Sequence, residues 1–320
     1  MTAAPRLIRP ATREVRNRAF DSAFWDDFPI RSDDIIISTY PKCGTTWTQR
    51  IVGMMVFGSA EPFGVQDSSP WPDFRAPPPG AMLGLAESQS HRRFLKSHLP
   101  FDALPFYEGV KYIHVARDGR DAAMSFFNHK SNYTAESIAR WIELSNEDPK
   151  FGDGDSYDFS PQDPVAHFTH WVDGPEDHQG DPGAGYFEME KSFWAARHEP
   201  DVLLVHFNDL KADREGEMRR IAEFLGIELA GDVWSDIVAA AGFDAMKGDA
   251  ARLMPTAGEV WKGGGNTFLN KGTNKRWEGV FREDDLARYD AKVAAEFSDA
   301  LAAWCEHGRL VAGDPRELED

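Results

Sequence analysis

Short apolar runs alternate with amphipathic stretches along the chain, and both patterns predict regular structure. Residues 34–39 (Asp-Ile-Ile-Ile-Ser-Thr) form the clearest run, and its β-branched residues are typical of a strand buried on both faces. Similar runs predict further strands, and stretches with helical periodicity follow three of them. The predicted strands are residues 34–39, 94–98, 111–117 and 201–207, and the predicted helices are residues 45–57, 119–128 and 213–225.

This alternation predicts an α/β fold with a central parallel sheet and helices on both of its faces. In such sheets, ligands bind at the carboxyl ends of the strands. Lys42, His98 and Arg117 fall at or just beyond predicted strand ends. Asp118 is placed to cap the next helix, with Asp121 in its first turn. We therefore expect a functional cleft at this edge of the sheet.

Long segments of irregular pattern separate these elements, and such lengths are typical of functional lids or of disordered segments. No composition break marks a boundary, so residues 1–320 are predicted to form a single domain. The amphipathic stretch 284–305 predicts one helix, and the charged tail, residues 308–320, is predicted to be frayed. The segments predicted to be irregular are residues 68–80, 146–164, 173–185 and 258–274.

Composition narrows the function classes. The hydrophobic fraction of 42% is sufficient for a sizeable core, and the net charge of −18 argues against general nucleic-acid binding. The longest apolar stretches, such as residues 51–57, are too short to span a membrane, and residues 1–18 lack the apolar core of a secretory signal. With only Cys43 and Cys305, a disulfide framework is excluded, and a cytoplasmic location is predicted.

The turn around Lys42 has the pattern of an anion site. A strand, a tight turn and the start of a helix present backbone N–H groups to an anion, and the helix dipole favours negative charge there. Lys42 adds a cation, Gly44 permits close approach of the backbone, and Thr45 and Thr46 add hydroxyl donors. Because Lys42 precedes Gly44, the loop is not a Walker A motif.

A second candidate group lies in residues 95–100 (Leu-Lys-Ser-His-Leu-Pro). Lys96 and His98 are two residues apart, so on a strand their side chains share one face. A neutral imidazole can accept a proton from a hydroxyl, while a neighbouring cation stabilises negative charge. A lone histidine at a strand end is more often structural, but beside a phosphate loop the catalytic interpretation is favoured. His167 and His170 lack further ligands at suitable spacing, so no metal site is predicted.

Four segments together resemble the cytosolic-type sulfotransferases that use 3′-phosphoadenosine 5′-phosphosulfate (PAPS). Residues 38–47 resemble the 5′-phosphosulfate loop of that family, with Cys43 where the family usually has Ser. Residues 95–100 look like its catalytic strand, whose histidine is the base. Residues 115–127 resemble its 3′-phosphate signature, and residues 270–277 its closing loop. The resemblance covers about residues 31–304 and leaves residues 1–30 as an N-terminal extension.

The resemblance implies a three-layer fold similar to that of P-loop nucleotide hydrolases, and it implies site residues. Arg117 and Ser125 would hold the 3′-phosphate. Phe207 falls where the family commonly has an adenine-contacting Tyr, Phe243 would pack on the purine, and Trp47 would stack on its other face. The implied cofactor-binding residues are Lys42, Cys43, Gly44, Thr45, Thr46, Trp47, Arg117, Ser125, Phe207, Phe243, Asn270, Lys271 and Gly272.

The closing loop departs from the family pattern. Asn270 replaces an Arg and Lys275 replaces a Gly, so either the affinity for the cofactor is weakened, or Lys275 or Arg276 compensates. Arg120, within the 3′-phosphate signature, is predicted to be an exposed helix charge, with a phosphate-binding role as the less favoured alternative. The dimer motif of the family is not recognisable near the C-terminus, which leaves the oligomeric state open.

The predicted reaction is in-line transfer of a sulfuryl group from PAPS to a hydroxyl or amine of a small, apolar acceptor. His98 acts as the base, Lys42 and Lys96 stabilise charge, no metal is required, and adenosine 3′,5′-bisphosphate (PAP) is released. The acceptor is predicted to be a phenol, an alcohol or a sterol-like molecule. The aromatic residues predicted to line its pocket, unless they are core residues, are Trp71, Phe74, Phe168 and Trp171.

Two other functions share parts of this pattern. A P-loop kinase would also have the strand–loop–helix cradle, but it needs a Gly-Lys-Ser/Thr ending and an Asp for magnesium. A non-catalytic PAP sensor would not need Lys96 and His98. Cys43 carries a separate hypothesis, because a thiol at a helix N-terminus can have a lowered pKa and oxidise readily. The alternative is a Ser replacement without consequence.

Overall fold

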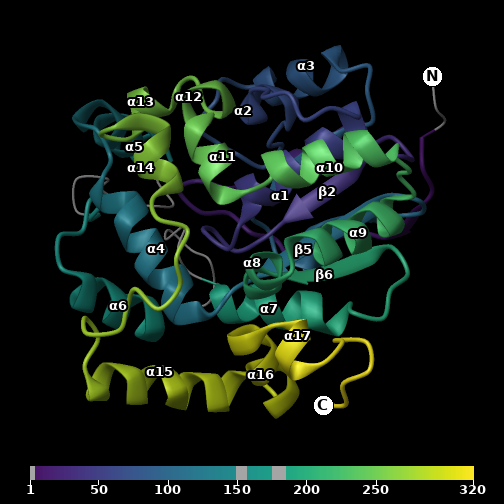
Figure 1. Ribbon diagram of the computed structural model, residues 1–320. Helices are drawn as coiled ribbons and strands as arrows, with labels where there is room; N and C mark the ends of the chain where they lie inside the picture. The colour runs from purple at the N-terminus through teal and green to yellow at the C-terminus, as the bar shows by residue number, and fades with distance from the viewer. Residues whose placement is uncertain (1–3, 149–156, 175–184) are drawn as a thin grey trace.

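A four-stranded parallel sheet lies at the centre of the molecule, in the order β3-β2-β5-β6 (Figure 1). The computed structural model describes residues 4–148, 157–174 and 185–320. Ile36 pairs with Leu95 on one side and with Tyr112 on the other, so β2 is an inner strand. The strands are β1 (Leu7–Arg9), β2 (Ile35–Ser38), β3 (Phe94–Ser97), β4 (Phe106–Tyr107), β5 (Lys111–Ala116) and β6 (Val202–His206), of which β1 and β4 form a separate antiparallel pair.

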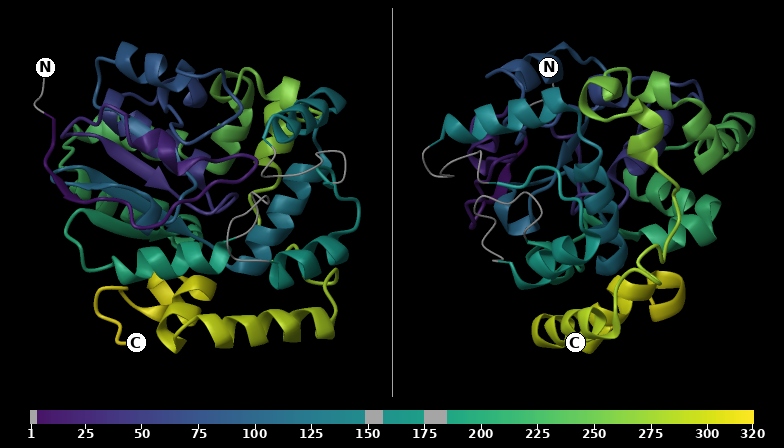
Figure 2. Two further views of the ribbon diagram at one scale, coloured as in Figure 1. Left: turned by 180° about the vertical axis from the view of Figure 1, so that it is seen from behind. Right: turned by 90° about the vertical axis from the view of Figure 1, so that its left-hand side faces the viewer.

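Helices connect the strands and cover both faces of the sheet (Figure 2). The α-helices are α1 (Thr45–Phe57), α2 (Val65–Ser68), α3 (Ala81–Ser88), α4 (Gly119–Ser131), α5 (Ala135–Asn146), α6 (Pro164–Asp173), α7 (Tyr186–Ala195), α8 (Phe207–Ala212), α9 (Arg214–Leu225), α10 (Gly231–Ala240), α11 (Phe243–Gly248), α12 (Ala250–Leu253), α13 (Ala257–Val260), α14 (Gly264–Leu269), α15 (Glu283–Glu296), α16 (Asp299–His307) and α17 (Arg309–Ala312). Two 3₁₀ turns, η1 (Ser22–Trp25) and η2 (Phe101–Ala103), complete the set.

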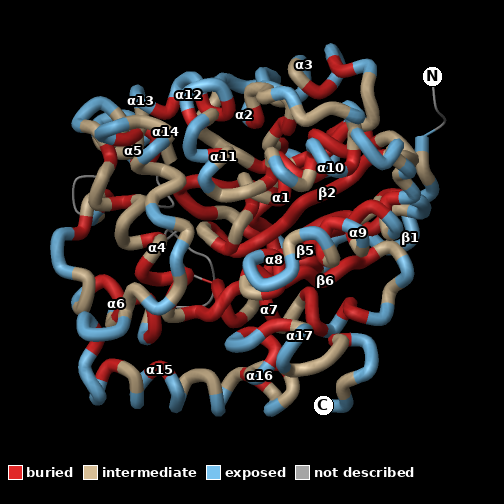
Figure 3. The backbone as a smooth tube through the Cα atoms, in the orientation of Figure 1, coloured by how far each residue is buried: buried red, intermediate tan, exposed pale blue. Residues whose placement is uncertain are grey.

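The core consists of two large layers separated by the sheet. Ile35 and Ile37 point to one face, where they join side chains of α1, α9 and α10. Ile36 and Leu95 point to the other face, where they join side chains of α4, α7 and α16. Both faces of the strands are therefore buried, as Figure 3 shows for the central tube. This is the three-layer α/β fold predicted from the alternation of strands and helices.

The predicted strand and helix positions along the sheet are confirmed within one to three residues at each end. The predicted cap is also present, since the Asp118 carboxylate accepts a hydrogen bond from the Arg120 N–H, and Asp121 lies in the first turn of α4. Of the segments 146–164 and 173–185, which were predicted to be irregular, residues 149–156 and 175–184 lie outside the described residues. None of the helices in the described ranges is both long and apolar enough to cross a bilayer.

Three predictions for the C-terminal third are wrong. Residues 284–305 form two helices, because Ser298 caps α16 by accepting a hydrogen bond from the Leu301 N–H and Phe297 is extended. The tail is not frayed. It contains α17, and the Arg316 guanidinium donates to the carbonyl oxygens of Arg197 and Val202. The segment 258–274 is not wholly irregular, since it holds α14 and most of α13.

The N-terminal segment before the sheet packs tightly against the rest of the protein. Val15, Phe20 and Trp25 are buried in the larger core layer. Backbone hydrogen bonds join this segment to the loop between α2 and α3. The Asp21 N–H donates to the Asp73 carbonyl, and the Arg75 N–H donates to the Ala19 carbonyl. The extension therefore forms part of the wall around the carboxyl ends of the strands.

Candidate active site

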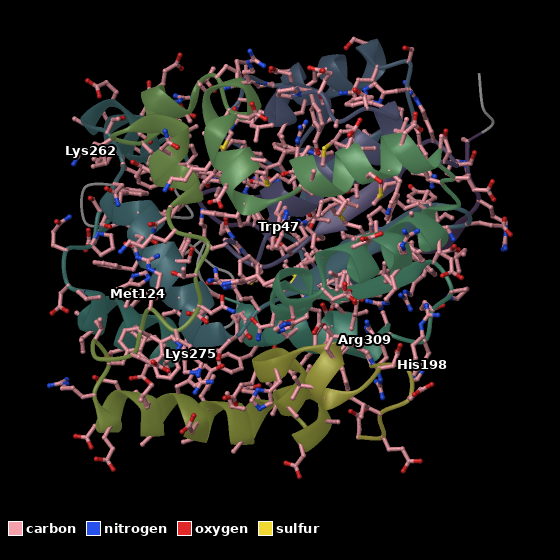
Figure 4. The ribbon with its side chains drawn as sticks, in the orientation of Figure 1. Trp47, Met124, His198, Lys262, Lys275 and Arg309 are labelled. Carbon is pink, nitrogen blue, oxygen red and sulfur yellow. The ribbon has the colours of Figure 1, made fainter. Side chains whose placement is uncertain are left out.

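A cavity of about 780 Å³ opens at the carboxyl ends of β2, β3 and β5. It brings together residues that are far apart in the sequence, and Figure 4 shows Trp47, in the first turn of α1, near the centre of the molecule. The predicted site residues that line it are Lys42, Gly44, Thr45, Thr46, Trp47, Trp71, Phe74, Lys96, His98, Arg117, Ser125, Phe207, Phe243, Asn270 and Gly272. The predicted residues that do not line it are Cys43, Lys271, Phe168 and Trp171.

The loop between β2 and α1 has the geometry of an anion cradle. Lys42 and Gly44 both have positive φ angles, 73° and 114°, which turn the chain sharply into α1. A Cβ atom at Gly44 would lie 3.1 Å from the ring of Phe207, so a side chain there would be crowded as well as strained by the positive φ. The first N–H groups of α1 have no partner within the helix, so they remain available to a ligand.

Three cations converge on this end of the cavity. Lys42, Lys96 and Arg117 line it, and none of them forms an ion pair with a carboxylate of the described residues. Burial, together with the charges of Lys96 and Arg117, lowers the pKa of Lys42 to about 7. Burial also lowers the pKa of Lys96 to about 7. The charge of Asp73 raises the pKa of Lys96 and that of Asp121 raises the pKa of Arg117, in both cases against the larger effect of burial.

Arg117 is held in place through its two terminal nitrogens. Nη1 donates to the Lys42 carbonyl at 3.1 Å, and Nη2 donates to the Thr273 carbonyl at 3.2 Å. The guanidinium lies 4.2 Å from the centre of the Phe207 ring. Its Nε is buried and has no hydrogen-bond partner in the described part of the chain. An orphaned buried donor on a fixed guanidinium fits an arginine that receives an anionic ligand.

His98 is buried at the end of β3, with its two ring nitrogens in different environments. Nδ1 lies 2.6 Å from the Thr39 carbonyl, and because a carbonyl only accepts, Nδ1 carries the proton. Burial, followed by the charge of Lys96, lowers the pKa of His98 well below its usual range. The imidazole is therefore neutral, with the lone pair on Nε2. This is the tautomer that a general base needs.

Aromatic side chains form the wall beside the anion cradle. The Trp47 indole N–H donates to the Ala241 carbonyl at 2.8 Å, and its ring meets that of Phe207 edge to face at 5.5 Å. Phe243 reaches the same wall from α11, and a Cβ atom at Gly272 would overlap its ring at 2.4 Å. Ser125 lies on α4 at the cavity surface. The arrangement fits a purine near Trp47 and phosphates near Arg117.

The closing segment, residues 270–277, follows α14. It lines the cavity with residues that differ in part from those of the family pattern. Asn270 and Gly272 line the cavity, whereas Lys271 does not. Of the two candidates to replace the missing arginine, Arg276 lines the cavity. Lys275 has a positive φ of 60°, and its side chain is 72% exposed and pairs with Glu278. Figure 4 shows Lys275 on the connection that leads from α14 to α15.

A second wall of the cavity, which begins beside Lys96, is aromatic. Trp71 and Phe74 stack at 4.0 Å between ring centres, and Phe20 of the N-terminal segment lies 5.5 Å from Trp71. The prediction that Phe168 and Trp171 line this pocket is wrong. Phe168 stacks on Phe281 within the core, and the Trp171 indole donates to the Tyr40 hydroxyl at 2.6 Å. Other apolar and aromatic residues that line the cavity include Met82, Trp141, Leu144, Trp261 and Phe268.

Two further expectations are corrected. Cys43 is completely buried, and burial raises the pKa of its thiol well above the usual range, which contradicts the hypothesis of a reactive thiolate. Arg120 is not an exposed helix charge. Its side chain is 12% exposed, pairs with Asp118 and Glu306, and lies over the Trp277 ring.

The structure adds residues that the sequence patterns did not single out. Lys211 and Arg214 line the cavity beyond β6, and His129 of α4 lies with its Nδ1 3.4 Å from the Lys42 Nζ. Lys211 and Arg214 follow a strand and His129 lies on a helix, but no motif in the sequence marked any of the three as a site residue. Asp73 lies behind Trp71, where its carboxylate accepts the indole N–H at 3.2 Å.

Comparisons with known proteins agree on one family. A model described as a sulfotransferase domain matches residues 32–300. A glycolipid sulfotransferase of Mycobacterium bovis (strain BCG / Pasteur 1173P2) is 32% identical, over 94% of this chain and 96% of that protein. Sulfotransferase 1A1 of Rattus norvegicus is 28% identical, over 85% and 87%.

Solved structures show the same fold. Retinol dehydratase in complex with androsterone and PAP has a TM-score of 0.66 at 22% identity, over 87% of this chain and 84% of that one. A mouse sulfotransferase complexed with PAP has a TM-score of 0.63 at 18% identity, over 88% and 90%. Since the family model covers most of its length, the chain belongs to the PAPS-dependent sulfotransferase family.

Proposed function

We propose that the protein transfers a sulfuryl group from PAPS to a hydroxyl, or an amine, of a small apolar acceptor and releases PAP. The observation that supports this most strongly is the group of Lys42, Lys96 and Arg117 at one end of the cavity without a carboxylate among the described residues to pair with them. Burial makes these groups costly to charge, and a bound ligand with several negative charges would offset that cost.

The phosphate and sulfuryl contacts follow from the positions of these cations. The start of α1, with Thr45 and Thr46, would bind the 5′-phosphosulfate, and Arg117 with Ser125 would bind the 3′-phosphate. Arg276, rather than Lys275, would replace the arginine that Asn270 lacks. Lys42 and Lys96 would stabilise the charge that develops on the leaving phosphate and on the sulfuryl oxygens.

The acceptor would be activated by His98. Nδ1 is tied to the Thr39 carbonyl, so Nε2 is free to accept the proton of an acceptor hydroxyl. The sulfur–oxygen bond to the leaving phosphate breaks as the acceptor oxygen bonds to sulfur, and the proton remains on His98. In-line transfer of this kind needs no covalent bond to the protein, and we propose no metal ion. Turnover that is unchanged by EDTA would support the proposal that no metal ion takes part.

The acceptor class is proposed from the second, aromatic wall of the cavity. Phe20, Trp71, Phe74 and Trp141 offer a flat apolar wall to a ring or a hydrocarbon body, as in a phenol, an alcohol or a sterol-like molecule. The relative from Mycobacterium bovis is named for a glycolipid, which also joins hydroxyls to an apolar body. A panel of 2-naphthol, a sterol, retinol and a galactolipid, assayed with labelled PAPS, tests this proposal.

PAP is expected to bind about 10- to 100-fold more tightly than AMP, which lacks only the 3′-phosphate. Each charged hydrogen bond to that phosphate contributes about 1.5–3 kcal/mol. Isothermal titration calorimetry measures the difference, with ADP and ATP–Mg²⁺ as controls. Stronger binding of ATP–Mg²⁺ than of PAP would instead favour a kinase. PAP binding without turnover of any acceptor in the panel would favour a PAP sensor.

PAP binding at pH 8 is expected to take up protons. Because burial lowers the pKa of Lys42 and of Lys96 to about 7, both amines are mostly neutral at pH 8 in the free protein. A bound phosphate favours the charged form and raises these pKa values, so the complex gains protons from the buffer. The observed binding enthalpy should therefore rise with the ionisation enthalpy of the buffer. A flat or falling dependence would contradict the assignment of these lysines.

A further inference from the structure

We propose that Asp73 is a positioning residue for sulfuryl transfer, which acts by holding Trp71 against Lys96 and His98. The inference rests on the proposed function, because it concerns the same two side chains. Asp73 itself does not line the cavity, and neither its type nor its spacing marked it in the sequence. Its importance comes from the groups that its buried carboxylate connects.

The carboxylate of Asp73 is fully buried, and no lysine, arginine or histidine within the described ranges forms an ion pair with it. It accepts hydrogen bonds from two indole groups and from the Ser97 hydroxyl, and its charge raises the pKa of Lys96 against the lowering by burial. The Trp25 Nε1–H donates to Oδ1 and the Trp71 Nε1–H donates to Oδ2, both at 3.2 Å. The His98 backbone N–H also faces Oδ2, at 3.5 Å. A buried carboxylate costs free energy, and these hydrogen bonds offset part of that cost while they tie the carboxylate to Trp25 and Trp71.

Trp71 connects Asp73 to the two proposed catalytic side chains, Lys96 and His98. Its ring lies 3.6 Å from the Lys96 Nζ, as a cation–π contact. The same ring meets the His98 imidazole edge to face, at 5.0 Å between ring centres. The Lys96 backbone N–H donates to the Pro70 carbonyl at 2.8 Å, which joins the strand to the same loop. One indole therefore contacts both proposed catalytic side chains, and Asp73 fixes its orientation.

The position of Asp73 is itself fixed by the N-terminal segment. The Asp21 N–H donates to the Asp73 carbonyl at 2.9 Å, and Trp25, which binds Oδ1, is buried in the core. Asp21 and Trp25 therefore fix the position of Asp73, and Asp73 in turn fixes the Trp71 indole. Because catalysis depends on the distance and the angle of reacting groups, a small rotation of Trp71 is expected to slow the transfer without changing the cofactor site.

A double-mutant cycle tests this inference. Asp73→Asn and Trp71→Phe are each expected to lower kcat about 10- to 100-fold with the best acceptor of the panel, because small misplacements have effects of this size. PAP affinity should stay at the wild-type value in both, which also shows that they fold. The double variant should be no slower than Trp71→Phe alone. Asp209→Asn is the matched control, since Asp209 is a buried carboxylate that does not itself line the cavity and accepts hydrogen bonds from the N–H groups of Arg309 and Leu310, and its kcat should be unchanged.

A spectroscopic measurement makes the test independent of turnover. In protein labelled with ¹⁵N at the indole nitrogens, the Nε1–H resonances of Trp71 and Trp25 should shift in Asp73→Asn and not in Asp209→Asn. Additive losses in the cycle, or unmoved indole resonances, would overturn the role of Asp73. Failure of the wild-type protein to bind PAP would overturn the proposed function instead, so the two failures are distinguishable.

Discussion

Replacement of His98 by asparagine is expected to lower kcat by about 10²–10⁴-fold, the usual contribution of a positioned general base. Asparagine can keep a hydrogen bond to the Thr39 carbonyl, which His98 makes through Nδ1, but its amide cannot accept a proton at neutral pH. PAP affinity should change little, because the imidazole faces the acceptor end of the cavity. Steady-state kinetics with the best acceptor, together with PAP calorimetry, measure both effects.

The control for this variant is His91→Asn. His91 does not line the cavity, and its Nδ1 binds the Arg92 carbonyl. Its replacement should leave kcat unchanged. If His98→Asn retained wild-type turnover in a preparation free of wild-type enzyme, His98 could not be the base. His129, the other neutral histidine of the cavity, would then be the residue to replace next.

Replacement of Lys42 by methionine is expected to lower kcat by about 10²–10³-fold, as for other single groups that stabilise transition-state charge. Methionine keeps an unbranched chain of similar length over the Phe268 ring, which the Lys42 Nζ contacts at 3.8 Å, but it removes the charge. The effect should fall mainly on kcat, because the charge on the leaving phosphate grows during the reaction.

Lys262→Met is the control for the loss of a lysine charge. Lys262 is exposed and lies near the outer edge of the molecule in Figure 4, away from the cavity lining. Its replacement should leave kcat and KM unchanged. If Lys42→Met raised KM for PAPS and left kcat unchanged, Lys42 would contribute to binding the ground state and not to the transition state.

The anion cradle could be predicted from sequence because its geometry is local. The turn from β2 into α1 is set by consecutive residues, and Gly44 and the two threonines mark it directly. Arg117 and His98 could be placed for a similar reason, since the carboxyl ends of parallel strands lie at one edge of the sheet. Their partners, such as the Thr39 and Thr273 carbonyls, depend on loops and were not predictable.

The predictions of pocket residues were wrong where an aromatic residue could equally lie in the core or line a cavity. Phe168 and Trp171 have the apolar periodicity of a helix face, and that periodicity does not distinguish a core from a cavity. In the closing segment, the positive φ of Lys275 turns its side chain outward and leaves Arg276 at the cavity. Asp73 was missed because its two indole partners lie 48 and 2 residues away, a pattern with no sequence signature.

The N-terminal segment adds to the proposed acceptor wall from outside the domain that the family model matches. The proposed donor site is built from the β2–α1 turn, β5 and the segment after α14, all within the matched domain. Phe20, which completes the acceptor wall, and Asp21, which supports Asp73, precede that domain. Substitutions at Phe20 or Asp21, which the family model does not cover, can therefore change the acceptor preference and leave the chemistry of sulfuryl transfer the same. Two proteins with identical signature motifs need not share an acceptor.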